Sequence, residues 1–441
     1  MLLLFLPQLL SLPLCKELFI GALQNKTHCS ISIDHLRLSW LGPQKMDLVN
    51  MEREDFQGTI DTLSIGAPLW AVPGLFQLKN LKQIHGDLKL EGGTFQFGPD
   101  AKIEEIKISM KVIEGTAHLI ASGNGLSLEG TISSFKDLSL RAVLSSFPTL
   151  PIARFFSLRH WGKEDTLKEV LGPWINLEAS SSIQYGKGFM DLSLHSENVT
   201  CLLLGDLNEE FLTLRRPLTA TFKLTPELSL WVLRQFNPLF LTGIQSKNPI
   251  QLRIEPLNFT LPISSFSLRD LDIGQGTLAM GQVRVRNGPL LVSLISLLKM
   301  DWLSQSPEMN IWFAPMSFQL KDGVLYTGRM DTLLADSLHI CTWGNINVID
   351  QDLDLFLGLT SELLENSFGI ENLPSDYVLK IPITGSTRHP KIGKEAAALK
   401  IAALKTMQTT PLKRTAPGKL LQMFTPNEKG VPPARRPFPW D

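Results

Sequence analysis

The sequence is poor in charged residues and in tyrosine. Asp, Glu, Lys and Arg together make up 19% of the 441 residues, and there are three tyrosines. Soluble domains usually carry about 25% charged residues, whereas here apolar residues reach 44% and the mean hydropathy is +0.07. The chain therefore has enough apolar side chains for a packed core and for apolar surface as well. Its length suits one large domain or two to three ordinary ones.

Cysteine is also scarce. The four cysteines, Cys15, Cys29, Cys201 and Cys341, form neither a C-x-x-C pair nor a spacing typical of zinc ligands. Residues so widely scattered are no disulfide framework, and one or two bridges in an oxidising compartment remain an open alternative.

Signatures of catalysis and of metal binding are absent. No two of the eight histidines lie within four residues of each other, and there is no G-x-S-x-G, phosphate-loop or dinucleotide-binding glycine motif. His195 and His339 fall inside predicted strands, where we expect a hydrogen-bonded or surface role. We expect no catalytic residue, no metal and no cofactor. Only the tail is basic, so nucleic acid is not an expected partner.

Acidic residues cluster once, in "VIDQDLDLF". Asp352 and Asp354 alternate with Leu353 and Leu355, which places the two carboxylates on the polar face of a predicted strand. Together with Asp350 they suggest calcium or, as we prefer, a hairpin with solvated carboxylates.

The first residues are almost wholly apolar. Thirteen helical residues would span about 20 Å, which is less than the roughly 30 Å hydrocarbon core of a bilayer. No Lys or Arg precedes this run and no signal-peptide cleavage site follows it. We therefore predict a truncated membrane anchor, and the alternative is an amphipathic segment lying on the membrane. The predicted anchor residues are Leu2, Leu3, Leu4, Phe5, Leu6, Leu9, Leu10, Leu12 and Leu14.

Alternation of apolar and polar residues dominates the rest of the chain. In "DLSLRAVLSSF", Leu138, Leu140 and Leu144 fall on one face of a strand. Roughly sixteen to twenty such strands, separated by Gly, Asp and Asn turns, predict a mainly β protein of antiparallel meanders. Its apolar face must be covered by a second sheet, by closure into a barrel, or by acyl chains held in a long, curled sheet. Open sheets rarely exceed about ten strands, so we expect two sheets or one strongly curled one.

A few helices are predicted between the strands. They cover residues 157–170, 289–302, 361–368 and 393–407, and one more begins at Pro226 behind the N-cap Thr225. The segment 289–302 is apolar nearly all round, which predicts a buried or lipid-facing helix.

The C-terminal region is basic. From residue 386 onward, eleven Lys or Arg stand against three Asp or Glu, a net charge of +8 in a chain whose overall charge is −1. Residues 411–441 are rich in proline and without periodicity, so we predict a largely disordered tail. It is either simply solvated or in contact with an anionic surface such as phospholipid head groups.

Two stretches carry a recognisable pattern. The first runs from the apolar start through "KELFIGALQNKTHCSISIDHLRLSWLGPQKMDLVNM", and the second from "DLDIGQGTLAMG" to "YVLKIPITGSTRHPKIG". In the second, the matching elements are Asp322-Gly323, Gly344 with Ile346 and Val348, Asp352 to Leu357, Ile381-Pro382-Ile383 with Gly385, and Pro390-Lys391-Ile392. With these elements the chain resembles the AsmA-like proteins of Gram-negative envelopes, the group that includes TamB and YhdP.

The resemblance implies a non-enzymatic protein held in the inner membrane, with most of its chain in the periplasm. Its long, strongly curled antiparallel sheet would form a β-groove, shaped like a taco, that carries the acyl chains of phospholipid for outer-membrane biogenesis. The alternative is a non-enzymatic assembly or scaffold factor for outer-membrane proteins. The candidate groove residues are Leu338, Ile340, Ile346, Val348, Leu353, Leu355, Leu357, Leu138, Leu140 and Leu144.

The expected organisation follows from these patterns. The anchor and a short helix occupy residues 1–26, an AsmA-like β region 27–156, a middle region with helical insertions 157–248, and a second AsmA-like β region 249–392. A helix at 393–410 and the tail at 411–441 complete the chain.

Overall fold

The computed structural model describes most of the chain. The described residues are 16–17, 20–21, 24, 29–39, 42–53, 56–67, 86–97, 101–134, 137–158, 164–208, 210–263, 269–298, 300, 306–409 and 430–441. The predicted anchor (2–14) and residues 411–429 of the predicted tail lie outside them. The described part forms two compact units, residues 1–209 (unit 1) and 210–441 (unit 2). The division falls inside the predicted middle region 157–248.

The mainly β prediction is confirmed. The described residues form 25 strands, more than the sixteen to twenty expected, and the strand pairs are antiparallel. Two of the extra strands arise because an alternating stretch of sequence is interrupted and forms two strands in place of one. β17 ends before Met280, and Gly281, with a φ of +64°, begins β18. The Ala314-Pro315 step separates β19 from β20, since proline has no N–H for the ladder.

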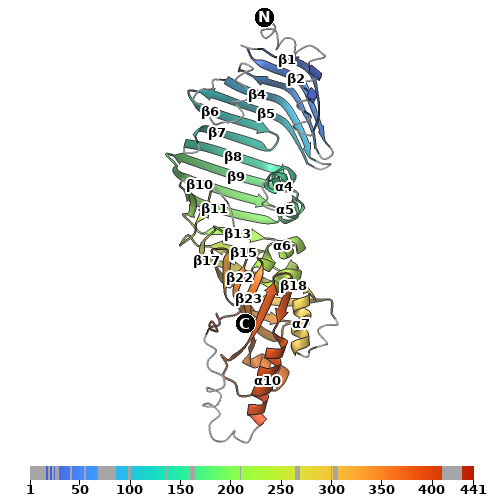
Figure 1. Ribbon diagram of the computed structural model, residues 1–441, viewed down its shortest axis with the longest axis vertical. Coiled ribbons are helices and arrows are strands. Elements are labelled where there is room, and N and C mark those ends of the chain that lie inside the picture. Colours follow the sequence, from blue (N-terminus) through green and yellow to red (C-terminus); the bar gives the residue numbers. More distant parts are fainter. Residues whose placement is uncertain are drawn as a thin grey trace. The chain divides into compact units, whose positions relative to one another are not determined.

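Unit 1 is a meander in which each strand pairs with the next along the chain (Figure 1). Two short helices, α4 and α5, lie beside β8 and β9. The elements are β1 (Ser30–Arg37), β2 (Gln44–Arg53), β3 (Phe56–Ile65), β4 (Gly86–Phe97), β5 (Ala101–Ile113), β6 (Thr116–Gly123), β7 (Leu126–Ser134), β8 (Asp137–Pro148), α4 (Thr149–Leu158), α5 (Glu164–Leu171), β9 (Trp174–Gln184), β10 (Lys187–Ser196) and β11 (Val199–Leu207).

The expected strong curl is not observed. No described pairing closes β1 onto β11, and the sheet is neither a barrel nor strongly curled. The expectation rested on the rule that open sheets rarely exceed about ten strands without curling. The strands form one long antiparallel sheet that stays open, and in unit 1 register shifts between β4 and β5, β7 and β8, and β8 and β9 allow the strands to twist locally.

Unit 2 has a sheet that branches at one strand. Its elements are β12 (Phe211–Leu214), β13 (Leu218–Phe222), α6 (Pro226–Trp231), η3 (Leu233–Gln235), η4 (Pro238–Thr242), β14 (Gly243–Ser246), β15 (Ile250–Ile254), β16 (Leu261–Pro262), β17 (Ile273–Ala279), β18 (Gly281–Arg286), α7 (Pro289–Leu298), β19 (Glu308–Phe313), β20 (Met316–Lys321), β21 (Val324–Leu334), β22 (Leu338–Asn347), β23 (Asp352–Thr360), α9 (Ser361–Phe368), β24 (Val378–Ser386), β25 (Pro390–Ile392) and α10 (Lys394–Thr409).

The branch point is β21. Its first residues pair with β20 and its last residues pair with β19, while its other edge pairs with β22 throughout. Between Thr327 and Met330 the register with β22 shifts, which is the mark of a bulge. This bulge contains Arg329.

Most helix predictions are confirmed. The helix α9 has the predicted bounds, α10 begins one residue later than predicted, and Thr225 caps α6 by accepting a hydrogen bond from the Leu228 N–H at 3.1 Å. One side of the apolar helix α7 is buried, with Leu291 and Leu294 almost fully covered, while Val292 is 47% exposed. The single helix predicted over 157–170 is wrong. The structure has α4 and α5 there, and α4 continues an apolar run that gives no sign of where β8 ends.

Candidate functional site

The most extensive candidate site is one face of the sheet in unit 1. Across β6 to β11, residues in register form four rows that cross six strands. We call these positions the apolar face. The rows are Ala117–Ile132–Leu138–Ile183–Gly188–Leu207, Leu119–Gly130–Leu140–Ser181–Met190–Gly205, Ala121–Leu128–Ala142–Ala179–Leu192–Leu203, and Gly123–Leu126–Leu144–Leu177–Leu194–Cys201.

The apolar face is only half-buried. Its leucine, isoleucine and methionine side chains have intermediate exposure, with Leu144 as the buried exception. Ser181 is its one hydroxyl-bearing residue. The opposite face of the same strands is richer in serine and charged residues, such as Glu129, Arg141 and Asp191, although Ile120 is exposed there.

One end of the apolar face joins a true core. Phe147 and Ile175 are buried in a cluster against which Ile152 of α4 and Leu171 of α5 pack. A bulge separates this end from the rest. Ser146 adopts a φ of +48°, and its N–H donates to Asn176 Oδ1 at 2.6 Å. The helices therefore cover the end of β8 and β9, and the rows along β6 to β11 keep partial exposure.

The predicted groove residues fall into two groups. Leu138, Leu140 and Leu144 belong to the apolar face of unit 1. The others belong to unit 2, where they are buried apart from Val348, which is half-buried; these are Leu338, Ile340, Ile346, Leu353, Leu355 and Leu357. That all of them line a groove stays a prediction, and in this conformation the buried ones are covered by the protein itself.

Around β22, both faces of the unit 2 sheet are covered. On the face that carries Leu355, Asn237 at the start of η4 donates to Thr342 Oγ1 at 2.8 Å, in a buried hydrogen bond between residues 105 positions apart. On the opposite face, Val431 packs on a cluster formed by Cys341, Trp343 and Val378.

The covering element on that opposite face is residues 430–441, which we call the C-terminal segment. Prediction placed it in a disordered tail, but it packs on β21 and β22. Phe438 and Trp440 stack on each other at 4.9 Å between ring centroids, and both rings meet His339, at 5.0 and 5.7 Å. Its two aromatic residues among prolines were the sequence signal for packing, because such rings bury large apolar areas.

A charged cluster lies beneath the C-terminal segment. An Nη of Arg329 lies 2.7 Å from Asp331 Oδ1, and His339 Nε2 lies 2.9 Å from the same oxygen. Arg329 also donates to the carbonyl oxygen of Pro432 at 3.3 Å. This arrangement satisfies the expectation that His339 is hydrogen-bonded. His195 lies on the surface with Nδ1 3.0 Å from Thr200 Oγ1, which agrees with the same expectation.

The acidic residues of "VIDQDLDLF" lie in a hairpin with solvent-exposed carboxylates, which is the interpretation that we favoured. Asp352 and Asp354 are exposed while Leu353 and Leu355 are buried, and Asp350 lies in the turn, where its carboxylate accepts from Asn347 Nδ2 at 2.9 Å. Among the described residues, no group of three His, Cys, Asp or Glu is placed to hold a metal ion.

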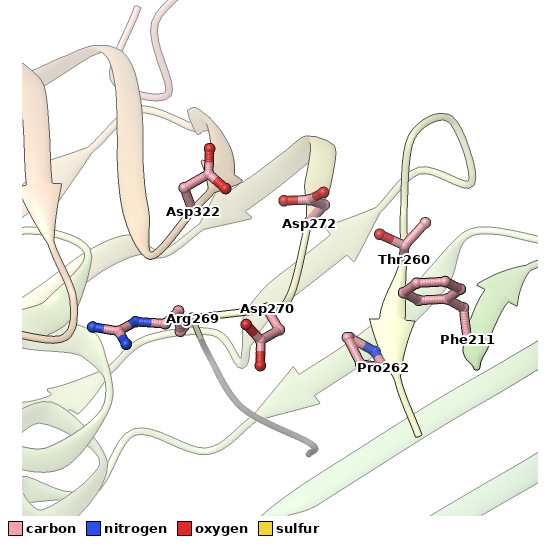
Figure 2. Close-up of a pocket in the computed structure, with 7 residues that line it drawn as sticks. All are labelled: Phe211, Thr260, Pro262, Arg269, Asp270, Asp272 and Asp322. Atoms are coloured by element: carbon pink, nitrogen blue, oxygen red, sulfur yellow. The ribbon is translucent and has the colours of Figure 1, made fainter. Parts of the chain in front are cut away.

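A hollow of about 680 Å³ opens in unit 2 (Figure 2). The carboxylates of Asp270, Asp272 and Asp322 border it on one side, and Figure 2 shows the ring of Phe211 beside Thr260 and Pro262 on the other. Its remaining lining residue is Arg269. The seven lining residues include no serine, cysteine or histidine, so they offer no nucleophile paired with an imidazole base.

Comparison with known proteins identified no similar protein. No family model, no curated protein and no solved structure matches this chain. Within the described residues, no helix has both the length and the apolar character needed to cross a bilayer.

Proposed function

We propose that this protein is a non-enzymatic lipid-binding protein of the AsmA-like type, in which the apolar face of unit 1 holds the acyl chains of phospholipid. The observation that carries the proposal is the set of four apolar rows in register over six strands. A folded protein normally covers such a surface, because each buried CH₂ stabilises by about 0.8 kcal/mol. Here the large side chains of the rows, apart from Leu144, stay half-exposed.

The dimensions suit an acyl chain. Strands lie about 4.8 Å apart, so six strands measure about 24 Å from first to last. One leaflet of a bilayer core is about 15 Å thick, half of the roughly 30 Å total. A single acyl chain laid across the strands therefore fits within the apolar face. Its methylenes would gain contacts with leucines of the rows while its polar end stays in water.

The setting follows from the resemblance. In this proposal the protein is associated with the inner membrane through residues 2–14, and its two units lie in the periplasm, where they bind or transfer phospholipid for outer-membrane biogenesis. No step requires a cofactor or a catalytic side chain, because the transferred molecule is bound and released unchanged.

The test compares two substitutions in the same strand. Leu140 lies on the apolar face and its neighbour Ser139 is exposed on the other. We expect Leu140→Asp to abolish the copurification of phospholipid, as measured by native mass spectrometry, and Ser139→Asp to leave it unchanged. Both variants add one carboxylate to β8, so net charge does not explain a difference.

Two outcomes would contradict the proposal. If Leu140→Asp retains phospholipid at the wild-type level, the apolar face is not the binding surface. If the wild-type protein is free of lipid and crosslinks to outer-membrane β-barrel proteins instead, the assembly factor becomes the better interpretation.

A further inference from the structure

Unit 2 buries a cation for which the described residues supply no hydrogen bond and no counter-ion. The whole of Arg234, in η3, is 1% exposed, and its Nε is enclosed without a hydrogen-bond partner. Among the described residues it forms no hydrogen bond and no ion pair, and its one specific contact is with the ring of Trp231, 5.7 Å from the guanidinium carbon. Burying a charged group without hydrogen bonds or a counter-ion to compensate for its lost hydration is costly in free energy.

A second arginine meets the same ring. The guanidinium carbon of Arg388, in the turn between β24 and β25, lies 5.8 Å from the centroid of Trp231. Arg388 is exposed, and within the described residues it likewise has no carboxylate partner. Burial, and then the nearby charge of Arg388, lower the pKa of Arg234 below its ordinary value. Two like charges thus share one aromatic ring with no counter-ion from the described protein.

The backbone holds Trp231 and Arg234 close together. Thr225 caps α6, Pro226 begins it, and the Val232 N–H closes its last turn by donating to the carbonyl oxygen of Leu228. Arg234 follows within three residues of Trp231, so the short helix fixes the ring and the guanidinium relative to each other. Guanidinium groups are preferred protein ligands for phosphate oxygens, since each group presents a planar fork of donors.

The surface around the two arginines is apolar. Leu230 is 41% exposed and Val232 is 40% exposed, on either side of Trp231 in the chain. Exposed aliphatic side chains beside tryptophan and arginine are typical of surfaces that lie at the boundary between lipid and water. A soluble anion gains nothing from Leu230 and Val232, whereas a lipid head group brings acyl chains to them.

We propose that Arg234 and Arg388 bind the phosphate of a phospholipid head group, with Trp231, Leu230 and Val232 against the adjoining part of the lipid. The phosphate supplies the negative charge that the two guanidinium groups lack. The inference does not depend on the apolar face of unit 1, because it concerns a head group in unit 2 and not the acyl chains.

The experiment uses the full chain in a neutral detergent and three soluble probes, with affinity measured by calorimetry. The probes are dihexanoylphosphatidylglycerol, dihexanoylglycerol, which lacks the phosphate, and inorganic phosphate. We expect Arg234→Met and Arg388→Met each to weaken binding of the phosphatidylglycerol about tenfold or more, as the loss of a charge-assisted hydrogen bond predicts. Binding of dihexanoylglycerol should not change in either variant.

The control is Arg284→Met, which removes an exposed cation from β18 in the same unit and should bind all three probes like the wild type. Arg388 is exposed, so its variant tests the site even if Arg234→Met fails to fold.

Wild-type affinity for phosphatidylglycerol in Arg388→Met overturns the proposal. Equal, arginine-dependent affinity for inorganic phosphate overturns the assignment to lipid. Loss of dihexanoylglycerol binding in Leu140→Asp alone would report on unit 1 and not on this site.

Discussion

An Nη of Arg329 lies 2.7 Å from Oδ1 of Asp331, and the two side chains, separated by a single residue on β21, are both buried. Side chains at positions i and i+2 of a strand share a face. Here the bulge after Thr327 brings the guanidinium into line with the carboxylate. The pair is completed by His339 on β22 and covered by the C-terminal segment.

Removing the carboxylate of this pair should be strongly destabilising. Asp331→Ala leaves the buried guanidinium of Arg329 without its counter-ion, and breaking a buried pair from one side costs about 3–5 kcal/mol. Urea unfolding should show this loss in the free energy of unfolding. Asp354→Ala, on the exposed side of β23, is the control and should change it by less than about 0.5 kcal/mol. Similar small changes in both variants would show that the pair contributes nothing.

The C-terminal segment should stabilise unit 2 through its aromatic residues. Phe438 is 7% exposed and stacks on Trp440, so Phe438→Ala should lower the free energy of unfolding by about 3 kcal/mol. Thermal unfolding measures the change, and Arg435→Ala, whose side chain is exposed, should behave like the wild type. If removal of residues 430–441 leaves the melting temperature unchanged, the segment does not pack as described.

The two groups of predicted groove residues should respond differently to charge. Leu355 is 1% exposed, so Leu355→Asp should unfold unit 2, because a buried carboxylate adds its desolvation cost to the roughly 2–5 kcal/mol of a truncated leucine. Leu140→Asp lies on the half-exposed apolar face and should cost only about 1 kcal/mol. Urea titration followed by circular dichroism measures the free energy of unfolding of each variant and distinguishes the two outcomes. A folded Leu355→Asp protein would mean that this face opens to solvent.

The thiol of Cys341 should make stability depend on alkaline pH. Burial raises its pKa from 9.0 to about 12, with smaller opposing effects of Arg329 and Asp331. In the unfolded chain the thiol ionises at lower pH, so its contribution is fully present below about pH 9 and is lost as the pH rises toward 12. The free energy of unfolding of the wild type should therefore fall more steeply over this range than that of Cys341→Ala. Parallel curves would show that the thiol is not buried in the folded state.

Much of the local structure could be predicted from the sequence. Period-two alternation identifies the strands and their apolar sides, so the sides of Leu353 and Leu355 on β23 are as predicted. Capping chemistry placed the start of α6 at Pro226, and α9 has its predicted bounds. These features depend on neighbours a few residues away, which a sequence displays directly.

Which apolar faces are covered could not be predicted from the sequence, because it depends on tertiary packing. "DLSL" on β8 and "DLDL" on β23 carry the same alternation, yet Leu140 is half-exposed and Leu355 is buried. The difference comes from chain far away in sequence. Asn237 reaches Thr342 across 105 positions, and the C-terminal segment reaches Arg329 across 103. Alternation defines a face, but burial depends on which distant segment packs over it, and that information is absent from the local pattern.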